Sequence, residues 1–455
     1  MTPVKKINRD ICEGPIFKSL IRYIIPLMLT NLIQVFYISA DNIIAGVFCG
    51  SAALAAVGSA STIISFLTTL IVGLSTGASV CVAQAVGAKD NEKLKRTVQS
   101  ILVISFIGGI IISLCGLLFS KPLLVATNTP KEILGDTVAY LLCAFSAYVF
   151  FIPAVFINGV LLSIGETKKP MIFSVTTGLT NVFLNLLFSG LLGMGVFGLA
   201  LATAISQVFS FGLNFWALFG KHSDIKVDWR KPKIDLQIFK EILILGLPTG
   251  IQNSVITLSN LIIRATYNSF GVAFLSGYTA AQNVLSVGGM IFSAFIQAAS
   301  VYAGQNYGAG NFARIKKSLN ICVVCVAVTG LLFGIATLVF GKELLSLYIT
   351  DSADALNYGL LTFSLLSLPS LISGVGNCLS GATRGMGVSL PQLFVSLGGA
   401  VGLKFLWIYT IFQTPKFHNP AGLLTADPII WILQTTVVAV IFAVTFRKKA
   451  SQKTN

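Results

Sequence analysis

Long apolar runs recur along the whole chain and restrict what it can fold into. A transmembrane helix needs about 20 consecutive, mostly apolar residues, and twelve such runs fit between residues 23 and 446. The runs are uninterrupted, whereas the strands of a membrane β-barrel alternate apolar and polar residues. Only 10% of the 455 residues are charged, which excludes an ordinary soluble domain with about 25% charged residues. We therefore predict an all-α polytopic membrane protein with twelve transmembrane helices.

The orientation of these helices follows from the basic residues, because cytoplasmic loops of membrane proteins carry an excess of Lys and Arg. The predicted helices lie near 23–47, 54–82, 97–119, 134–158, 170–190, 194–219, 242–266, 274–303, 318–340, 356–382, 391–413 and 428–446. Of the 31 Lys and Arg residues, 25 fall on the side of both termini, 4 on the other side and 2 within the helices. We expect both termini in the cytoplasm and a multi-pass protein in the plasma (inner) membrane, in contact with its lipids. The net charge of +15 then reflects topology, and no nucleic-acid partner is expected.

An internal duplication organises the chain. Residues 78–88 read ASVCVAQAVGA and residues 299–309 read ASVYAGQNYGA, and near the same spacing Pro26 corresponds to Pro248. An offset of six helices keeps both copies in one orientation, so the repeats are parallel, as in two-lobed alternating-access transporters. We predict two pseudo-symmetric six-helix lobes. The boundaries are an N-terminal lobe at 1–220, a cytoplasmic linker loop at 221–241, a C-terminal lobe at 242–446 and a basic cytoplasmic tail at 447–455.

A single acidic residue, Asp41, lies well inside a predicted helix, whereas the other 15 of 16 fall in termini, loops or helix ends. A carboxylate inside a bilayer costs on the order of 2.5–3.5 kcal/mol by insertion scales, so it points to a function. Gln34 and Tyr37 precede it by seven and four residues, which places both on the same helix face. We predict that they line a cavity beside Asp41. The alternative is that Asp41 is only a paired structural carboxylate.

Three other polar residues are expected at the depth of Asp41. Asn181 and Asn185 lie one turn apart on the fifth predicted helix, and Thr203 lies on the sixth. A carboxylate, two amide oxygens and a hydroxyl form a hard-oxygen set that suits a proton or Na⁺ and is too weakly charged for calcium. We therefore predict that these four residues couple transport to H⁺ or Na⁺. No resident cofactor is expected.

The second half of the chain lacks this set, because Gly402 and Leu406 stand where Asn181 and Asn185 would recur. It carries instead Lys404, about 20 Å along its helix at 1.5 Å per residue, as a candidate polar site of the second lobe. Lys404 could balance Asp41 across a cavity, close a gate or bind backbone carbonyls.

Six stretches of the chain resemble a known family. They are NLIQVFYISADNIIAG (31–46), ALAAVGSAS (53–61), GASVCVAQAVGAKD (77–90), GLPTGIQNSVITLSN (246–260), QNYGAGNFARIKKSLN (305–320) and RGMGVSLPQLFVSLGG (384–399). In these stretches the chain is similar to multidrug and toxic compound extrusion (MATE) transporters, specifically the bacterial branch with its ion site in the N-terminal lobe. The resemblance covers essentially the whole chain.

The resemblance implies a V-shaped pair of lobes that exports amphipathic, mostly cationic drugs or toxic compounds by antiport with H⁺ or Na⁺. By position it places the family's cation site on Asp41, Asn181, Asn185 and Thr203, with Tyr37 lining it. This chain departs from the pattern at Asn185, where relatives commonly have Asp, and therefore offers a single titratable group.

Other functions fit the residues less well. A flippase for a lipid-linked oligosaccharide precursor would line its cavity with several Arg or Lys for the pyrophosphate, and only Arg264 and Lys404 are available. A membrane-embedded enzyme would need a nucleophile or a metal cluster, and the predicted helices contain no His and no H-E-x-x-H motif. A channel or receptor fits a parallel duplication less well than rocking lobes do. We expect a monomeric transporter of small amphipathic organic substrates and not an enzyme.

Overall fold

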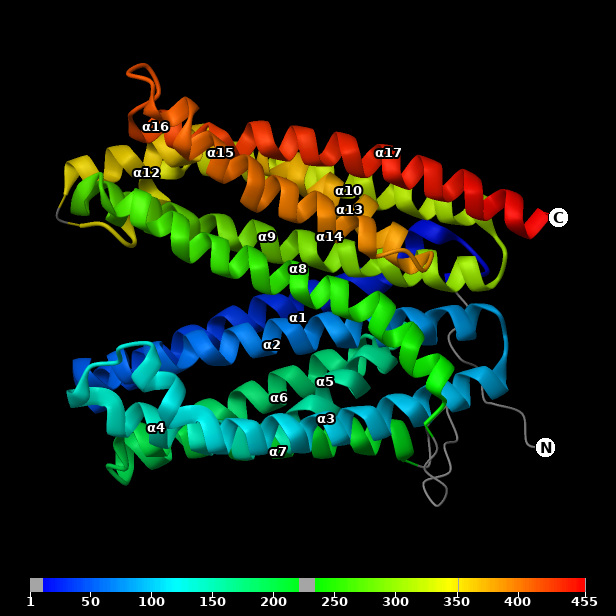
Figure 1. Ribbon diagram of the computed structural model, residues 1–455, viewed down its shortest axis with the longest axis horizontal. Coiled ribbons are helices and arrows are strands. Elements are labelled where there is room, and N and C mark those ends of the chain that lie inside the picture. The colour runs from blue at the N-terminus through cyan, green and yellow to red at the C-terminus, as the bar shows by residue number, and fades with distance from the viewer. Residues whose placement is uncertain (1–10, 221–233, 351, 455) are drawn as a thin grey trace. The chain divides into compact units, whose positions relative to one another are not determined.

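The computed structural model describes residues 11–220, 234–350 and 352–454, and every regular element in these ranges is helical (Figure 1). The chain separates into two compact units. The first unit contains Ile25–Leu247, and the second contains residues 11–24 together with the chain from Pro248 onward. Most of the predicted linker, residues 221–233, lies outside the described residues, and residues 236–241 form the start of a helix that begins at Leu236.

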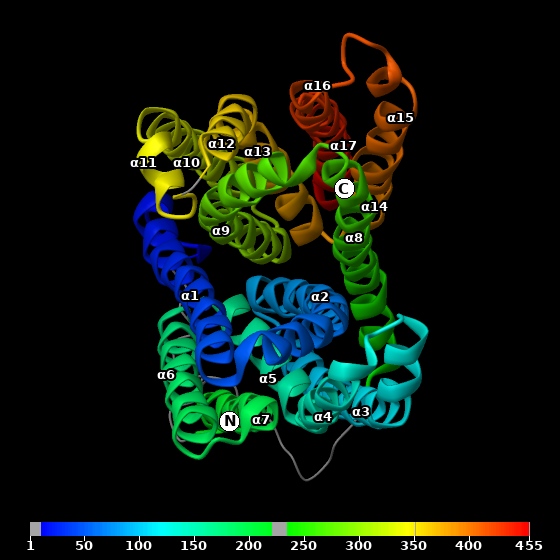
Figure 2. The ribbon, with the colours of Figure 1, turned by 90° about the vertical axis from the view of Figure 1, so that its left-hand side faces the viewer.

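The first unit is a bundle of antiparallel helices, seen nearly end-on in Figure 2. Its elements are α1 (Ile16–Ile44), η2 (Ala45–Cys49), α2 (Gly50–Gly87), α3 (Asn91–Ala126), α4 (Lys131–Ser146), α5 (Tyr148–Ser163), α6 (Lys168–Asn185), η3 (Leu186–Leu191) and α7 (Gly195–Phe219). The helices α4 and α5 each pack on α3 and on α7, and α6 packs on α7. Aliphatic side chains such as Ile101, Leu141 and Ile157 fill the core and are fully buried, so packing rather than polar contacts holds most of the bundle.

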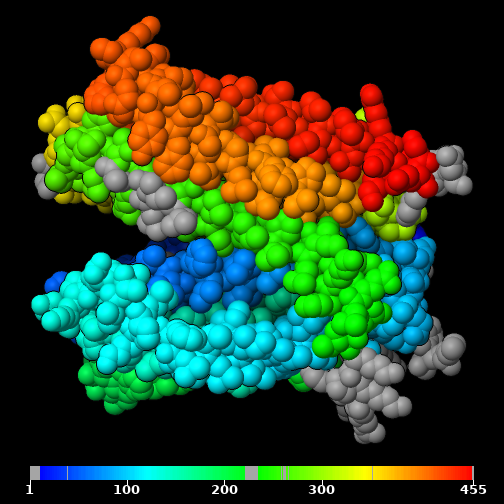
Figure 3. Space-filling view, in the orientation of Figure 1, coloured from blue at the N-terminus to red at the C-terminus, as the bar shows by residue number. Residues whose placement is uncertain are grey.

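The second unit repeats this plan with more breaks in its last helices. Its elements are α8 (Leu236–Asn268), α9 (Gly271–Gly308), α10 (Phe312–Val339), α11 (Gly341–Ser346), α12 (Ala353–Leu366), α13 (Ser370–Gly385), α14 (Leu390–Ser396), η4 (Leu397–Leu403), α15 (Lys404–Tyr409), η5 (Ile411–Gln413), α16 (Pro420–Leu424) and α17 (Ala426–Thr454). The long α9 packs against α10, α12 and α13, and α13 packs against α17. Figure 3 shows α14, α15 and α17 covering one face of this unit.

The helices of the structure can be matched to the twelve predicted ones. Among the described residues eight helical stretches are long and apolar enough to span a membrane, or ten if each of two bent pairs counts as one span. One of the eight, Ile16–Gly87, joins α1 and α2, and the chain reverses inside it at Gly50, whose φ of +83° favours glycine. Gly271 has a φ of +84° at the matching reversal between α8 and α9. Dividing the first stretch at Gly50 and adding α8 accounts for all twelve predicted helices.

Two predicted helices, 134–158 and 356–382, are broken at corresponding points of the repeats. The first bends by 52° between α4 and α5 at Ala147, and the second bends by 47° between α12 and α13. Pro153 removes one backbone hydrogen bond just after the first bend, and Pro369 lies at the second. The bend is therefore common to both repeats, although the proline lies at a different position relative to the bend in each repeat.

The helices α1 and α8 each begin in one unit and continue in the other. The change of unit falls at Ile25 in α1 and at Pro248 in α8, beside the two prolines that the duplication relates. Each helix nevertheless stays continuous through its proline. The predicted lobe boundaries at 1–220 and 242–446 stay a prediction.

The duplicated motif holds the leading segments of these two helices. In the second unit the Arg314 guanidinium donates hydrogen bonds of 2.9 Å to the backbone carbonyls of Ile11, Glu13 and Gly14. The Ser19 hydroxyl lies 2.8 Å from the Tyr302 hydroxyl. Each of these contacts joins a residue of the segment before Ile25 to the second copy of the motif or to the basic residues after it.

The residues that follow the first copy of the motif hold the start of α8 in a similar way but with ion pairs. Arg96 lies 3.6 Å from Asp235, and Lys93 lies 3.8 Å from Glu241. The backbone N–H of Asp235 also donates to the Ser100 hydroxyl at 3.0 Å. The residues that follow each copy of the motif, together with Tyr302 in the second copy, therefore anchor the segment that leads into the first helix of the other repeat.

Candidate ion-coupling site and family membership

The predicted site residues lie where α-helix changes to π-helix. Asp41 lies near the end of α1, just before η2, and Asn181 and Asn185 form the last turn of α6, just before η3. A π-helical turn inserts one residue per turn and shifts the direction of the side chains around it, and such turns are frequent at functional sites. The local backbone thus aims these polar groups into the bundle.

Four predicted residues form one hydrogen-bonded chain in the first unit. The Nδ2 atom of Asn185 donates to Oδ1 of Asp41 at 2.6 Å and to Oδ1 of Asn181 at 2.8 Å. The Nδ2 atom of Asn181 donates to Oγ1 of Thr203 at 3.4 Å, and the Thr203 hydroxyl donates to the backbone carbonyl of Leu199 at 3.0 Å. The structure therefore brings Asp41, Asn181, Asn185 and Thr203 together, and their role in coupling stays a prediction.

One oxygen of this chain is left over. Asn181 is 0% exposed and Asn185 is 1% exposed, and Oδ1 of Asn185 has no hydrogen-bond partner among the described residues. A buried acceptor without a donor costs about 1–3 kcal/mol. The site therefore retains one acceptor that a proton donor or a cation would satisfy.

Two tyrosines complete the surroundings of Asp41. The Tyr37 hydroxyl donates to the Asp41 carboxylate and lies beside Thr203, and an added Cβ at Gly178 would lie 3.7 Å from Cδ2 of the Tyr37 ring. Tyr140 on α4 hydrogen-bonds with Thr203 and was not predicted, because nothing in its sequence surroundings separates it from the other ten tyrosines.

Gln34 contributes less than its place on the helix face indicates. Its side chain is exposed, and the described part of the chain offers it no hydrogen-bond partner. Its role in lining a cavity stays a prediction.

The charge of the site limits what it can hold. Asp41 is its single carboxylate, and the described residues contain no group of three or more His, Cys, Asp or Glu side chains that could bind a metal ion. The remaining ligands are neutral amide and hydroxyl oxygens. A proton or one monovalent cation fits this set, whereas a divalent ion would need more negative charge.

Lys404, the candidate polar site of the second unit, has a specific partner. It is 4% exposed, lies directly after the π-helical η4, and its Nζ forms an ion pair with Oδ1 of Asp427 on α17. This pairing was not among the three roles predicted for Lys404, because Asp427 was expected at a helix end. Arg264 is exposed, as a snorkelling side chain would be.

Comparison with known proteins gives the class and then the family. The MatE family model matches the chain twice, over residues 26–187 and 248–410, so the two matches begin at the repeat-related Pro26 and Pro248. Two helical repeats of one transporter module define an integral membrane transporter. The matches cover more than half of the chain, and the protein therefore belongs to the MATE family.

Relatives and solved structures agree with this membership. The probable multidrug resistance protein YpnP of Bacillus subtilis (strain 168) is 30% identical over 390 residues, which cover 85% of this chain and 86% of YpnP. The multidrug export protein MepA of Staphylococcus aureus (strain MSSA476) is 24% identical over 87% of this chain and 88% of its own. A crystal structure of a MATE protein in its bent conformation superposes with a TM-score of 0.91 at 19% identity, over 100% of both chains. The outward-facing structure of a multidrug resistance MATE transporter gives 0.88 at 21% identity, over 99% of both chains.

Family membership decides between the functional classes left open by the sequence. Relatives are transporters and not enzymes, and the twelve-helix, two-lobed fold class is confirmed by the structural neighbours. The flippase alternative is not favoured, since the relatives with close matches are multidrug resistance or export proteins.

The ion pair of the second unit gives a stability prediction. Lys404→Met leaves Asp427, which is 21% exposed, without its cation, and we expect a loss of about 3 kcal/mol, the lower end for a broken buried pair. The thermal unfolding temperature of the detergent-purified protein should fall accordingly. Lys404→Met combined with Asp427→Leu should recover most of the loss.

The control breaks an exposed ion pair. Lys95→Met removes the contact of 3.5 Å with Glu92, whose side chain is 78% exposed, and should change stability by less than about 1 kcal/mol. A Lys404→Met variant that unfolds at the temperature of the parent would show that the pair does not stabilise the unit.

Proposed function

We propose that this protein is a secondary active exporter of small amphipathic, mostly cationic organic compounds, driven by an ion that moves inward through the site at Asp41. It works as a monomer in the plasma membrane with both termini in the cytoplasm, and the lobes at 1–220 and 242–446 alternate access around the substrate. The observation that carries the proposal is the partly buried Asp41 carboxylate, held by Asn185 beside an amide oxygen without a partner. A carboxylate of this kind is a default functional site in a membrane protein.

The hydrogen bonds favour H⁺ over Na⁺ as the coupling ion. Ionised Asp41 accepts hydrogen bonds from Nδ2 of Asn185 and from the Tyr37 hydroxyl. Protonated Asp41 carries in addition one O–H that needs an acceptor, and the Asn185 amide offers its unpartnered Oδ1 for this bond when it turns over. Na⁺ would require several ligand oxygens to turn toward it. Two candidate ligands, Oδ1 of Asp41 and Oδ1 of Asn181, already accept hydrogen bonds from Nδ2 of Asn185.

The turn of one amide also links the site to its neighbours. While Asp41 is ionised, Asn185 donates to Asn181, and Asn181 donates to Thr203. When the Asn185 amide turns so that its Oδ1 accepts from protonated Asp41, its Nδ2 no longer donates to Oδ1 of Asn181. The charge of Asp41 is thereby communicated from α1 through α6 to α7.

Transport follows from competition for the ionised carboxylate. A cationic substrate is attracted by ionised Asp41, and a proton that arrives from outside removes this attraction and releases the substrate outward. The proton drives the change only if it binds one state of the transporter more tightly than the other, because a ligand of equal affinity for both shifts nothing. Tyr37 beside the carboxylate supplies an aromatic ring of the kind that binds flat cations.

The first test removes the charge at nearly constant shape. Asp41→Asn should reduce the efflux of ethidium-like dyes from cells to the background of cells without the transporter, because the substrate loses its counter-charge and the proton its acceptor. The matched control is Asp136→Asn on α4, which makes the same change at an exposed carboxylate and should leave efflux unchanged. Dye efflux by Asp41→Asn at the parental rate, at equal amounts of folded protein in the membrane, would refute the mechanism.

A second test identifies the coupling ion. Inverted membrane vesicles should take up dye when a pH gradient is imposed with the lumen acidic, and a Na⁺ gradient alone should not drive uptake. Addition of a protonophore should abolish the uptake within the same experiment. Uptake driven by Na⁺ without a pH gradient would assign the coupling to Na⁺, and uptake under neither gradient would contradict ion-coupled export.

A further inference from the structure

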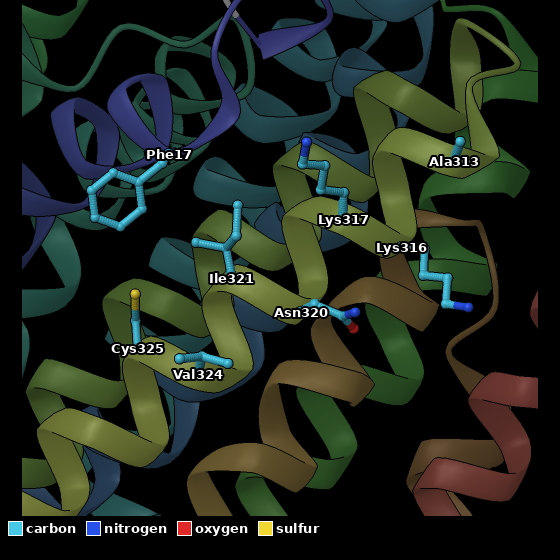
Figure 4. A pocket seen from close by; sticks show the side chains of 8 residues that line it. All are labelled: Phe17, Ala313, Lys316, Lys317, Asn320, Ile321, Val324 and Cys325. Atoms are coloured by element: carbon cyan, nitrogen blue, oxygen red, sulfur yellow. The ribbon is translucent and has the colours of Figure 1, made fainter.

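A groove in the second unit lies apart from both polar sites. It has a volume of about 520 Å³ and runs between the first turn of α1 and one face of α10 (Figure 4). Phe17 of α1 stands on one side, and Lys316, Lys317, Ile321, Val324 and Cys325 of α10 line the other. All of these residues belong to the second unit.

The groove changes character along α10. Lys316 and Lys317 line the end near the start of the helix, whereas Ile321, Val324 and Cys325 line the part that follows. Lys317 and Val324 are seven residues apart, which corresponds to about 10 Å along a helix. Phe17 is 60% exposed and Val324 is 59% exposed. The stems of two lysines thus adjoin an apolar surface that the protein itself leaves open, and the Lys316 amine points away from Phe17.

The duplication provides an internal comparison for the two lysines. Lys95 and Arg96 are their counterparts in the first unit, and both pair with carboxylates, Glu92 and Asp235. In the second unit the leading segment of α1 is held through backbone carbonyls by Arg314. Among the described residues neither Lys316 nor Lys317 has an ion-pair partner. In the first unit Lys95 and Arg96 are therefore paired with carboxylates. In the second unit their counterparts, Lys316 and Lys317, lie beside an apolar groove without a carboxylate partner among the described residues.

We propose that the groove binds one anionic phospholipid of the cytoplasmic leaflet. The lysines stand at the end of α10 that the distribution of basic residues assigns to the cytoplasm, where a membrane presents its phosphate headgroups. The phosphate diester pairs with Lys317, Lys316 adds positive charge at the same end of α10, and an acyl chain follows Phe17, Ile321 and Val324 into the bilayer. Because the groove has α1 on one side and α10 on the other, the lipid fastens the first turn of α1 to the second unit.

The test measures lipid binding to the full-length protein in detergent by native mass spectrometry. Phosphatidylglycerol and phosphatidylcholine with the same acyl chains are compared, and we expect the anionic lipid to bind at least about tenfold more tightly, since each Lys near a lipid surface contributes about 1 kcal/mol. The double variant Lys316→Gln/Lys317→Gln should reduce this preference to less than about twofold. Val324→Trp, which fills the apolar part, should weaken the binding of both lipids.

The matched control is Lys168→Gln/Lys169→Gln. It removes two adjacent lysines at the start of α6, at the same predicted membrane face, and should keep the full preference for phosphatidylglycerol. The proposal is overturned if Lys316→Gln/Lys317→Gln keeps the preference, if both lipids bind the parent equally, or if inorganic phosphate alone displaces the lipid. The last result would identify a soluble phosphate rather than a lipid as the ligand.

Discussion

The hydrogen bond of 2.6 Å between Asn185 and Asp41 is the interaction on which the account of the first unit depends. An ionised carboxylate inside an apolar bundle is tolerated only when polar groups replace its water, and here they come from the amide of α6 and the hydroxyl of Tyr37. The same amide leaves one oxygen without a partner. The arrangement is therefore satisfied for one charge state of Asp41 and is prepared for the other, which is what an ion-coupled transporter needs.

The sequence predicted this site because two simple rules apply inside membrane helices. Helical periodicity places Tyr37 on the face of Asp41, and the fixed rise per residue places Asn181, Asn185 and Thr203 at a common depth. The same rules gave twelve helices and their duplicated order. They could not give Tyr140, because residues on a separate helix meet the site only through tertiary packing of α4 against α7.

Other features escaped prediction for identifiable reasons. The π-helical segments η2, η3 and η4 depend on small backbone adjustments that apolar patterns do not record. The bends at Ala147 and near Pro369 interrupt runs that are apolar throughout. Asp427 was assigned to a helix end, so its pairing with Lys404 was not foreseen. Duplication explains the shared plan of the two units, whereas divergence at a few polar positions gives one unit a hydrogen-bonded carboxylate and the other an ion pair.

The central claim is that substrate and proton compete for Asp41. It is tested most directly by the protons released when a cationic dye binds the purified transporter in a weakly buffered solution at a pH where Asp41 is protonated. The account predicts release of about one proton per bound dye from the parent protein and none from Asp41→Asn when dye is supplied at a concentration that saturates both proteins. Equal proton release by both proteins, or binding to the parent without release, would contradict it.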